Sequence, residues 1–356
     1  MLMYKKMLLL KPDKFSNAGP NWQISNKNKF LKSVYDDLNN NLNINIKNFK
    51  VLNNLEINSS NILTEINGEK VILKVLKNLS NKDFSRKFNI YEYLTNKNTP
   101  TTRLSNLYEK KEIKSFSFEK NILFLEFING RYFNGSYSDI NKTSKSIRSL
   151  NQALEHINKN NLKKLEIYPK NSKEILEKFF FHNEIKYFEL SSHLRNFILK
   201  NKDFIFSTNE INEIIIKEIS EEKQEAFHID LHPHNILIQN QKSFIIDIDS
   251  IMLSRWQISI GFSFFKLLRQ TMIRKRKTNH LKINSINFLK KICNFSDTPD
   301  FWKSIFSGAQ IEIMRRILYI LKENIAYKSS EWNEVLEIQI QSLHDLKIFE
   351  RVFMNK

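Results

Sequence analysis

The chain has 356 residues, a formal net charge of +18 and one cysteine, Cys293. A single cysteine excludes an intrachain disulfide and fits a reducing compartment. The excess charge comes from lysines dispersed along the chain, with no concentrated recognition element, which argues against a nucleic-acid-binding protein. The apolar run near the N-terminus is too short for a signal-peptide core, and no run approaches the length of a membrane span. The sequence therefore predicts a cytoplasmic protein without a transmembrane segment.

Strands and a helix are predicted in the first third of the chain. A turn at Gly68 precedes a strand that runs through Val71 to Lys74 and ends at Leu76. A helix is predicted next, over residues 83–95. A second, apolar strand begins after Asn121 and runs into a connector that ends at Gly130. This order predicts a small, strand-rich region at the N-terminal side of the molecule.

Helical periodicity dominates the rest of the chain, over residues 172–188, 258–274 and 309–326. The aromatic run 179–181 is predicted to lie in the core. Two short apolar runs interrupt the helices. Residues 236–238 and 244–246 flank a polar turn, a pattern typical of a β-hairpin.

The segment before and after this hairpin carries the strongest chemical motif. His228 to Asn235 reads His-x-Asp-x-x-x-x-Asn, which is the spacing of a kinase-type catalytic loop, and Asp247 follows the hairpin. A hairpin would return Asn235 and Asp247 to the same end of the sheet. Amide and carboxylate oxygens are hard donors that suit Mg²⁺ beside the phosphates of a nucleotide. We therefore expect Asn235 and Asp247 to bind the metal.

His-x-Asp-x-His-Pro-x-Asn followed by Ile-Asp-x-Asp resembles the aminoglycoside phosphotransferase and choline kinase family, a branch of the protein-kinase-like fold. The resemblance implies a bilobal α+β fold. It places an N-terminal extension at residues 1–45, a small β-rich lobe at 46–128 and a large helical lobe at 129–356. It also implies transfer of the γ-phosphate of ATP, with Mg²⁺, to a hydroxyl of a small molecule. The motifs leave open whether that acceptor is a sugar, an amino alcohol, an aminoglycoside-like antibiotic or a lipid-linked saccharide.

The same resemblance assigns roles to residues of the catalytic loop. Asp230 would orient and deprotonate the acceptor hydroxyl, and His228 would brace the loop. His232 falls where protein kinases often place a lysine that touches the transferred phosphate. Asn235 and Asp247 would bind the metal, as the spacing of the hairpin also predicts.

The resemblance also assigns nucleotide contacts to the small lobe. Lys74, on its strand, would hold the phosphates. Ser60 and Asn61 occupy the place of the loop that covers the phosphates, although the glycines that allow close backbone approach are absent. The backbone near Glu126 and Ile128 would act as the hinge that binds the adenine edge.

One position departs from the family pattern. The helix after the lysine strand should carry a glutamate that pairs with Lys74, and Lys87 stands there instead. Glu92 lies five residues on, about 140° round the helix, and cannot simply substitute. Either Lys74 finds another partner, or the alignment is shifted, or catalysis is lost. The last case predicts a nucleotide-binding pseudokinase that acts as a scaffold or regulator.

Two further alternatives stay open. On a strand, His228, Asp230, His232 and His234 would share one face and could bind zinc, although Pro233 disfavours a strand there. The basic stretch 266–282 either is a solvated helix end or contacts an anionic acceptor or a membrane surface.

Overall fold

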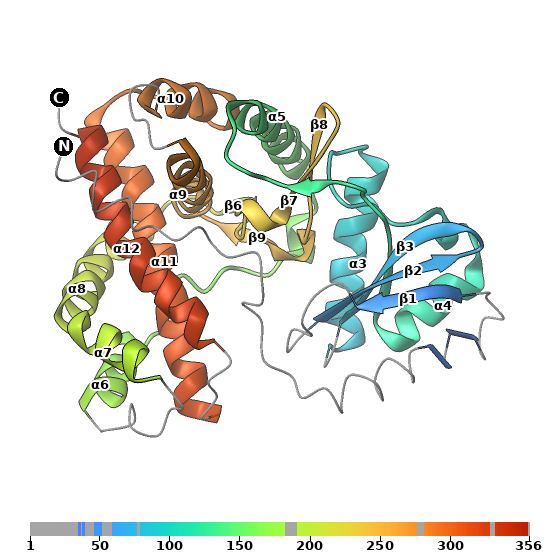
Figure 1. Ribbon diagram of the computed structural model, residues 1–356, viewed down its shortest axis with the longest axis horizontal. Helices are drawn as coiled ribbons and strands as arrows, with labels where there is room; N and C mark the ends of the chain where they lie inside the picture. Colours follow the sequence, from blue (N-terminus) through green and yellow to red (C-terminus); the bar gives the residue numbers. More distant parts are fainter. Residues whose placement is uncertain are drawn as a thin grey trace.

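The computed structural model describes residues 35–36, 38–39, 46–51, 59–76, 79–181, 191–275, 281–327 and 332–354. These residues form a small β-rich lobe and a larger, mainly helical lobe, which lie side by side in Figure 1. The α+β, two-lobed architecture expected from the sequence is therefore confirmed.

A four-stranded antiparallel sheet forms the small lobe, in the order β1-β2-β3-β4. Its strands are β1 (Ile46–Val51), β2 (Ser59–Ile66), β3 (Glu69–Leu76) and β4 (Ile122–Glu126). Asn67 and Gly68 join β2 to β3 and both have positive φ, the conformation that a two-residue Asn-Gly hairpin turn requires. The turn fixes the register that places Lys74 on β3 opposite Asn61 of β2.

Helix α3 (Asn81–Asn96) packs along this sheet. Ser80 caps its N-terminus by accepting a hydrogen bond from the Asp83 N–H, and the helix buries Phe84, Phe88 and Tyr91. Helix α4 (Lys111–Lys120) covers the far end of β4. Leu38, from the segment predicted as an N-terminal extension, is fully buried in the core of this lobe.

The large lobe begins at β5 (Arg131–Tyr132), which pairs with the predicted hairpin. The hairpin forms as expected from β7 (Ile236–Gln239) and β8 (Lys242–Ile245). A separate two-stranded sheet joins β6 (Glu225–His228) to β9 (Ile251–Ser254). These short strands lie between the small lobe and the helices, at the centre of the molecule (Figure 1).

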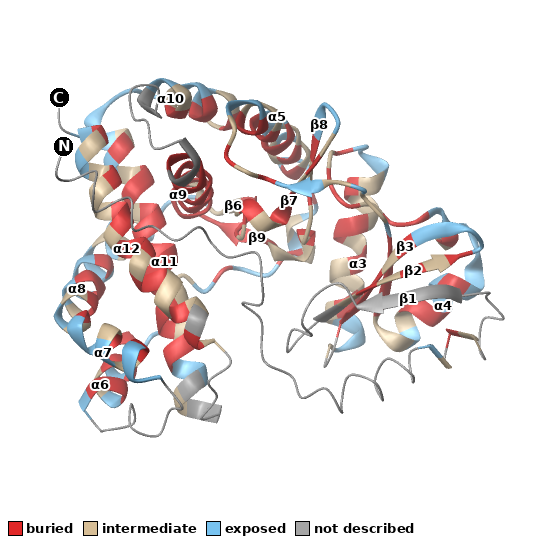
Figure 2. Cartoon of the chain, viewed as in Figure 1, coloured by how far each residue is buried: buried red, intermediate tan, exposed pale blue. Residues whose placement is uncertain are grey.

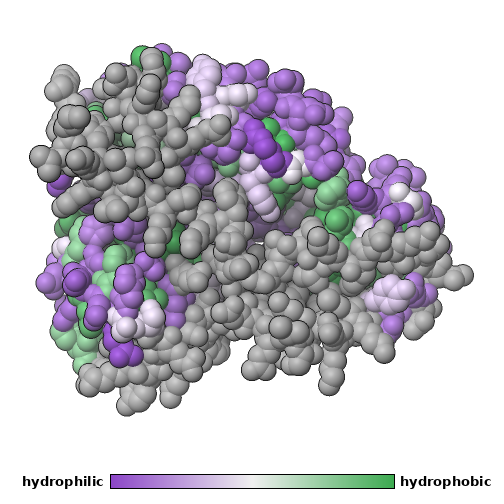
Figure 3. Space-filling view, viewed as in Figure 1, coloured by the Kyte–Doolittle hydropathy of each residue, from purple (hydrophilic) through white to green (hydrophobic). Residues whose placement is uncertain are grey.

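Eight helices of the described residues build the rest of this lobe. They are α5 (Tyr137–Leu154), α6 (Ser172–Phe181), α7 (Ser192–Lys200), α8 (Lys202–Ile219), α9 (Trp256–Lys275), α10 (Leu281–Ile292), α11 (Pro299–Tyr327) and α12 (Asn333–Met354). The buried faces of α9 and α11 meet at the centre of the lobe (Figure 2). The surface over α5 is mainly hydrophilic (Figure 3). No described helix is both long and apolar enough to cross a membrane.

The three predicted helical segments lie within α6, α9 and α11, apart from residues 182–188, which lie outside the described residues, and α11 begins earlier than predicted, at Pro299. The prediction that the whole aromatic run 179–181 lies in the core was wrong for its last member. Phe179 and Phe180 are buried, but Phe181 is 58% exposed and packs against Phe206 and the ammonium of Lys202. Three consecutive residues of a helix cannot all face one core.

The basic stretch 266–282 is not one surface patch. Lys266 and Arg269 lie on the buried face of α9, and the Arg269 guanidinium is 2.7 Å from the carboxylate of Asp345 on α12. Interpreting both as solvated charges was therefore wrong. The side chains of residues 274–277 lie outside the described set.

Two glycines let α9 and α11 approach closely. A Cβ atom on Gly308 would lie 2.0 Å from the Gln257 carbonyl oxygen, and one on Gly261 would lie 2.3 Å from that of Ile305. Because both obstacles are backbone atoms, a larger residue must push the two helices apart. The crossing thus depends on glycine at both positions.

We predict that Gly308→Ala lowers the free energy of unfolding by about 1–3 kcal/mol, the usual effect of overpacking a core. Thermal unfolding of the variant and the parent measures the loss. Ser307→Ala, one position earlier and half-buried, serves as the matched control and should change little. Equal melting temperatures for both variants would contradict this account of the crossing.

Candidate active site

The predicted catalytic loop connects β6 to β7. His228 ends β6, and Pro233–Asn235 form a 3₁₀ turn that leads into the hairpin. The loop is therefore not a strand, and its polar residues do not share one face. No group of three or more histidine, cysteine or acidic side chains in the described parts of the chain is placed to hold a metal ion, so the zinc alternative was wrong.

His228 connects the loop to the strand that follows the hairpin. The side chain is buried, its Nδ1 accepts a hydrogen bond from the Asp230 N–H at 3.2 Å, and its Nε2 lies 3.3 Å from the Ile246 carbonyl oxygen. Both contacts are satisfied by a neutral ring that donates through Nε2. Burial lowers the pKa of His228 to about 4, so the ring stays neutral near pH 7. This geometry suits the bracing role expected of His228.

Asp230 lies at the centre of a polar cluster in the loop. Its Oδ1 accepts from Nη2 of Arg316 at 2.8 Å, and its Oδ2 lies 3.4 Å from Nδ2 of Asn235 and 3.7 Å from Nε2 of His232. Burial would raise the pKa of Asp230, but the charge of Arg316 holds it far below its ordinary value. The carboxylate is therefore ionised and restrained from both sides.

Arg316 comes from α11, in a part of the sequence without a recognisable motif. Its Nε is 2.8 Å from the carboxylate of Glu312, a fully buried residue that also accepts two hydrogen bonds from Arg315 at 2.7 Å. The guanidinium lies 4.3 Å from the ring centre of Phe262 on α9, within the range of a cation–π contact. Glu312 and Phe262 thereby fix the position from which Arg316 reaches Asp230.

The hairpin brings the two predicted metal ligands together. The Ile246 N–H donates to the Asn235 carbonyl at 2.9 Å, which places Asp247 directly beside the end of the catalytic loop. The Asn235 amide nitrogen donates to the Asp230 carbonyl at 2.8 Å, so its Oδ1 faces elsewhere. Asp247 has positive φ, and its half-open side chain contacts Lys74 through Oδ1 only. One amide and one carboxylate oxygen remain, and this donor set suits Mg²⁺.

Lys74 does have acidic partners, although not on α3. Its side chain is buried and contacts the carboxylates of Asp247 and Asp249. Burial opposes its charge, but the two carboxylates raise the pKa of Lys74 well above its usual value. Lys87 pairs with Asp249 at 3.1 Å, whereas Glu92 is directed to Lys114 at 3.4 Å. The possibility that Lys74 finds another partner is therefore the one that the structure shows.

The remaining predicted residues lie at the edges of the site. Ser60 and Asn61 lie within β2 rather than in a loop, while residues 52–58 are outside the described set. Placing Ser60 and Asn61 in the covering loop was thus wrong. Glu126 ends β4 and its N–H donates to the Arg103 carbonyl at 3.0 Å, and the Ile128 carbonyl accepts from Gly130 at 2.9 Å. Both residues lie at the connection between the lobes.

No protein-family model and no curated protein matched the sequence. Solved structures did match the fold. A spectinomycin phosphotransferase in complex with ADP and spectinomycin is 14% identical with a TM-score of 0.62, over 88% of this chain and 93% of that one. The ethanolamine kinase of Plasmodium vivax is 12% identical with a TM-score of 0.57, over 98% and 99%. The choline kinase of Streptococcus pneumoniae is 14% identical with a TM-score of 0.52, over 89% and 99%.

The chain has the protein-kinase-like fold. In each comparison the similarity covers most of this chain and most of the other chain, so it includes both lobes. The expectation that the Asp230 motif belongs to a kinase-like architecture is confirmed at the level of the fold.

Sequence reasoning missed three contacts of the site. Asp249 was visible in the Ile-Asp-x-Asp motif but was given no role. Tyr91, whose hydroxyl lies 3.1 Å from Asp249, looked like an ordinary core residue. Arg316 lies 86 residues beyond Asp230 and had no local signal.

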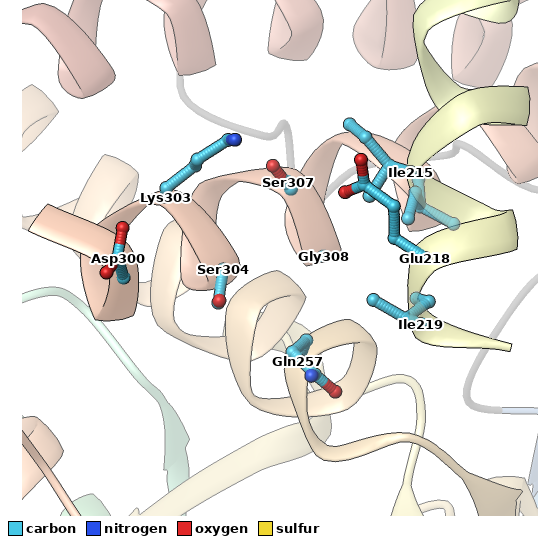
Figure 4. Close-up of a pocket in the computed structure, with 10 residues that line it drawn as sticks. Ile215, Glu218, Ile219, Gln257, Asp300, Lys303, Ser304, Ser307 and Gly308 are labelled. Atoms are coloured by element: carbon cyan, nitrogen blue, oxygen red, sulfur yellow. The ribbon is translucent and has the colours of Figure 1, made fainter. Parts of the chain in front are cut away.

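A cavity of about 200 Å³ lies apart from these residues, between α8, α9 and α11 (Figure 4). Glu218, Gln257, Lys303 and Ser307 are among its lining residues, and none of the predicted site residues is. One wall, Ile311, belongs to the same apolar cluster as Ile229, the residue before Asp230. The cavity is thus behind the catalytic loop and not part of the candidate site.

We predict that His228 makes the stability of the protein depend on pH below neutrality. Its pKa is about 4 in the folded state and about 6.5 when unfolded, so only the unfolded chain takes up this proton between those values. The stabilisation is complete above pH 6.5 and is lost as the pH falls towards 4, by about 3 kcal/mol in all. Thermal unfolding of the parent and of His228→Gln from pH 7.5 to 4.5 should show the difference between them shrinking. A difference independent of pH would contradict the neutral buried ring.

Proposed function

We propose that the protein is an ATP- and Mg²⁺-dependent phosphotransferase that moves the γ-phosphate to a hydroxyl of a small molecule. One observation carries this proposal. Asp230, Asn235, Asp247 and Lys74, which have the types and order of a kinase site, converge where the two lobes meet. Phosphoryl transfer depends mainly on positioning and charge neutralisation, for which such a cluster is suited. The solved structures of the same fold are named as small-molecule kinases, and they include complexes with ADP and with AMP-PNP.

Each residue of the site has its own role in the proposed phosphoryl transfer. Asp230, restrained by Arg316 and Asn235, accepts a hydrogen bond from the acceptor hydroxyl and directs its oxygen at the phosphate. Asn235 and Asp247 would hold Mg²⁺, which would supply positive charge against the phosphate oxygens. Lys74 and His232 would contact the phosphates.

The adenine edge would meet the hinge. The Glu126 N–H and the Ile128 carbonyl are already bonded within the chain. The Glu126 carbonyl and the Ile128 N–H are therefore the groups that would bind adenine. Ser60 and Asn61, at the start of β2, would lie next to the segment that covers the phosphates.

The acceptor belongs to the class of hydroxyl-bearing small molecules. The proteins of similar structure are a spectinomycin phosphotransferase, a choline kinase and an ethanolamine kinase. For this chain we propose the same class of reaction, and not any one of these acceptors. A cytoplasmic location and contact with an anionic surface through residues 274–277 belong to the proposal as well, and rest on composition and charge alone.

The pseudokinase alternative rested on Lys87 and on the absence of glycines before Asn61. Lys87 is no longer an argument for lost catalysis, because Lys74 contacts two carboxylates in place of the helix glutamate. Turnover measurements decide between an enzyme and a nucleotide-binding scaffold.

We predict that Asp230→Asn lowers ATP consumption by at least a hundredfold while leaving ATP binding within about threefold, since general-base positioning typically contributes 10²–10⁴-fold. The assay measures ATP consumption with Mg²⁺ against a panel of amino alcohols, sugars and aminoglycosides. Nucleotide binding is followed by the rise in melting temperature with ATP and Mg²⁺. Asp203→Asn, an exposed acid in the first turn of α8, is the matched control.

Each outcome of this experiment assigns the protein to one class. Turnover by the parent that Asp230→Asn removes supports the phosphotransferase. Stabilisation by ATP without turnover of any acceptor in the panel supports the scaffold. Undiminished turnover by Asp230→Asn would overturn the assignment of Asp230.

We also predict that Arg316→Met lowers kcat at least tenfold and leaves the KM for ATP within about twofold, because the variant releases Oδ1 of Asp230 from its fixed position. Arg315→Met is the control. It removes a partner of the same Glu312 without touching Asp230. Steady-state kinetics of both variants give the comparison, and equal kcat values would show that Arg316 acts only through the stability of α11.

A further inference from the structure

Lys87 and Asp249 form a contact that the kinase-like pattern does not contain. Lys87 occupies the position on α3 where a glutamate was expected to pair with Lys74. Instead, its ammonium lies 3.1 Å from Oδ2 of Asp249. Lys74 contacts the other oxygen of the same carboxylate. Two lysines of the small lobe therefore share one acid of the large lobe.

The Asp249 carboxylate accepts hydrogen bonds from three donors of the small lobe. Oδ1 accepts from Lys74 and from the Tyr91 hydroxyl at 3.1 Å, and Oδ2 accepts from Lys87. Tyr91 is fully buried, and the Asp249 side chain is only 12% exposed. Burial would raise the pKa of Asp249, but the charges of Lys74 and Lys87 hold it well below its usual value. Both oxygens of this carboxylate therefore have donors from the small lobe, whereas Asp247 contacts Lys74 through Oδ1.

The backbone explains how an acid of the large lobe reaches this position. Asp247 adopts a left-handed conformation, and the 3₁₀ turn Ile248–Ser250 follows at once. This turn packs against α3. Asp249 is therefore directed into the space between β3 and α3, where a glutamate from α3 itself would otherwise place its carboxylate.

We infer that Asp249 replaces the missing helix glutamate as the anchor of Lys74, and that Lys87 is the positioning residue that holds Asp249 in place. The inference rests on the proposed function, because it concerns how the phosphate-binding lysine is held. The group contains two acids and two lysines. A glutamate at position 87 would add a third carboxylate beside Asp247 and Asp249, so restoring the usual family residue should damage this site.

Three variants test the inference: Lys87→Glu, Asp249→Asn and the double variant that combines them. Lys87→Glu places two carboxylates side by side. The double variant removes the charge at 249 and offers Lys74 a glutamate on α3, which is the usual arrangement. Lys82→Glu makes the same substitution at an exposed position of the same helix and serves as the control.

Thermal unfolding without nucleotide provides the first readout. We expect Lys87→Glu and Asp249→Asn each to lower the melting temperature, the double variant to recover part of the loss, and Lys82→Glu to match the parent. Losses in the two single variants that simply add up in the double variant would overturn the anchor. This readout needs no catalytic activity, so it stands even if the proposed function fails.

Steady-state kinetics with ATP and Mg²⁺ provide the second readout. Lys87→Glu should raise the KM for ATP at least tenfold, and the double variant should recover at least threefold of it, while the KM of the acceptor stays within twofold. A parent without any turnover would overturn the proposed function alone. A parent with turnover whose KM for ATP is unchanged by Lys87→Glu would overturn this inference alone.

Discussion

The two lobes are joined by a buried group of charges, in which Lys74 of β3 contacts Asp247 and Asp249 of the segment after the hairpin. Taking an ammonium and a carboxylate out of water is unfavourable by several kcal/mol for each ion unless the partners are well placed. Here each charge has at least one opposite partner, and Lys87 and Tyr91 complete the set around Asp249. Removing Lys74 would leave Asp247 without its cationic partner, so the relative position of β3 and the hairpin depends on this group.

A second charged group holds the catalytic loop against the helices. Asp230 and Glu312 lie on either side of Arg316, and Phe262 covers the guanidinium. This arrangement requires α11 to lie close to α9. Gly261 and Gly308 permit that approach, so the position of the Asp230 carboxylate depends on two glycines that lie outside the catalytic loop. The close packing of α9 against α11 therefore helps to set the position of the Asp230 side chain.

The parts of the site that could be predicted are those whose signal is local in sequence. The loop from His228 to Asn235, the hairpin and Asp247 lie within 20 residues, and turn chemistry with strand alternation fixes their geometry. Lys74 could be predicted because the turn and the strand that position it are next to it in the sequence. Arg316 and Asp249 were not assigned, since their partners are set by tertiary packing that no periodicity records. The burial of Lys266 and Arg269 was missed for the same reason, because Asp345 lies 76 residues beyond Arg269.

The large positive charge of the chain says little about the substrate. Around the candidate site, four cationic side chains pair with four acidic ones: Lys74, Lys87, Arg315 and Arg316 with Asp230, Asp247, Asp249 and Glu312. The site therefore has equal numbers of cationic and acidic side chains among the described residues, whereas the formal +18 of the whole chain comes from residues elsewhere. Exposed charges are screened over about 10 Å at 0.1 M salt, so dispersed surface lysines act weakly on a small molecule in the site. We therefore expect the shape and hydrogen bonding around Asp230 to select the acceptor, and Arg316 of α11 is the charged neighbour that the structure places there.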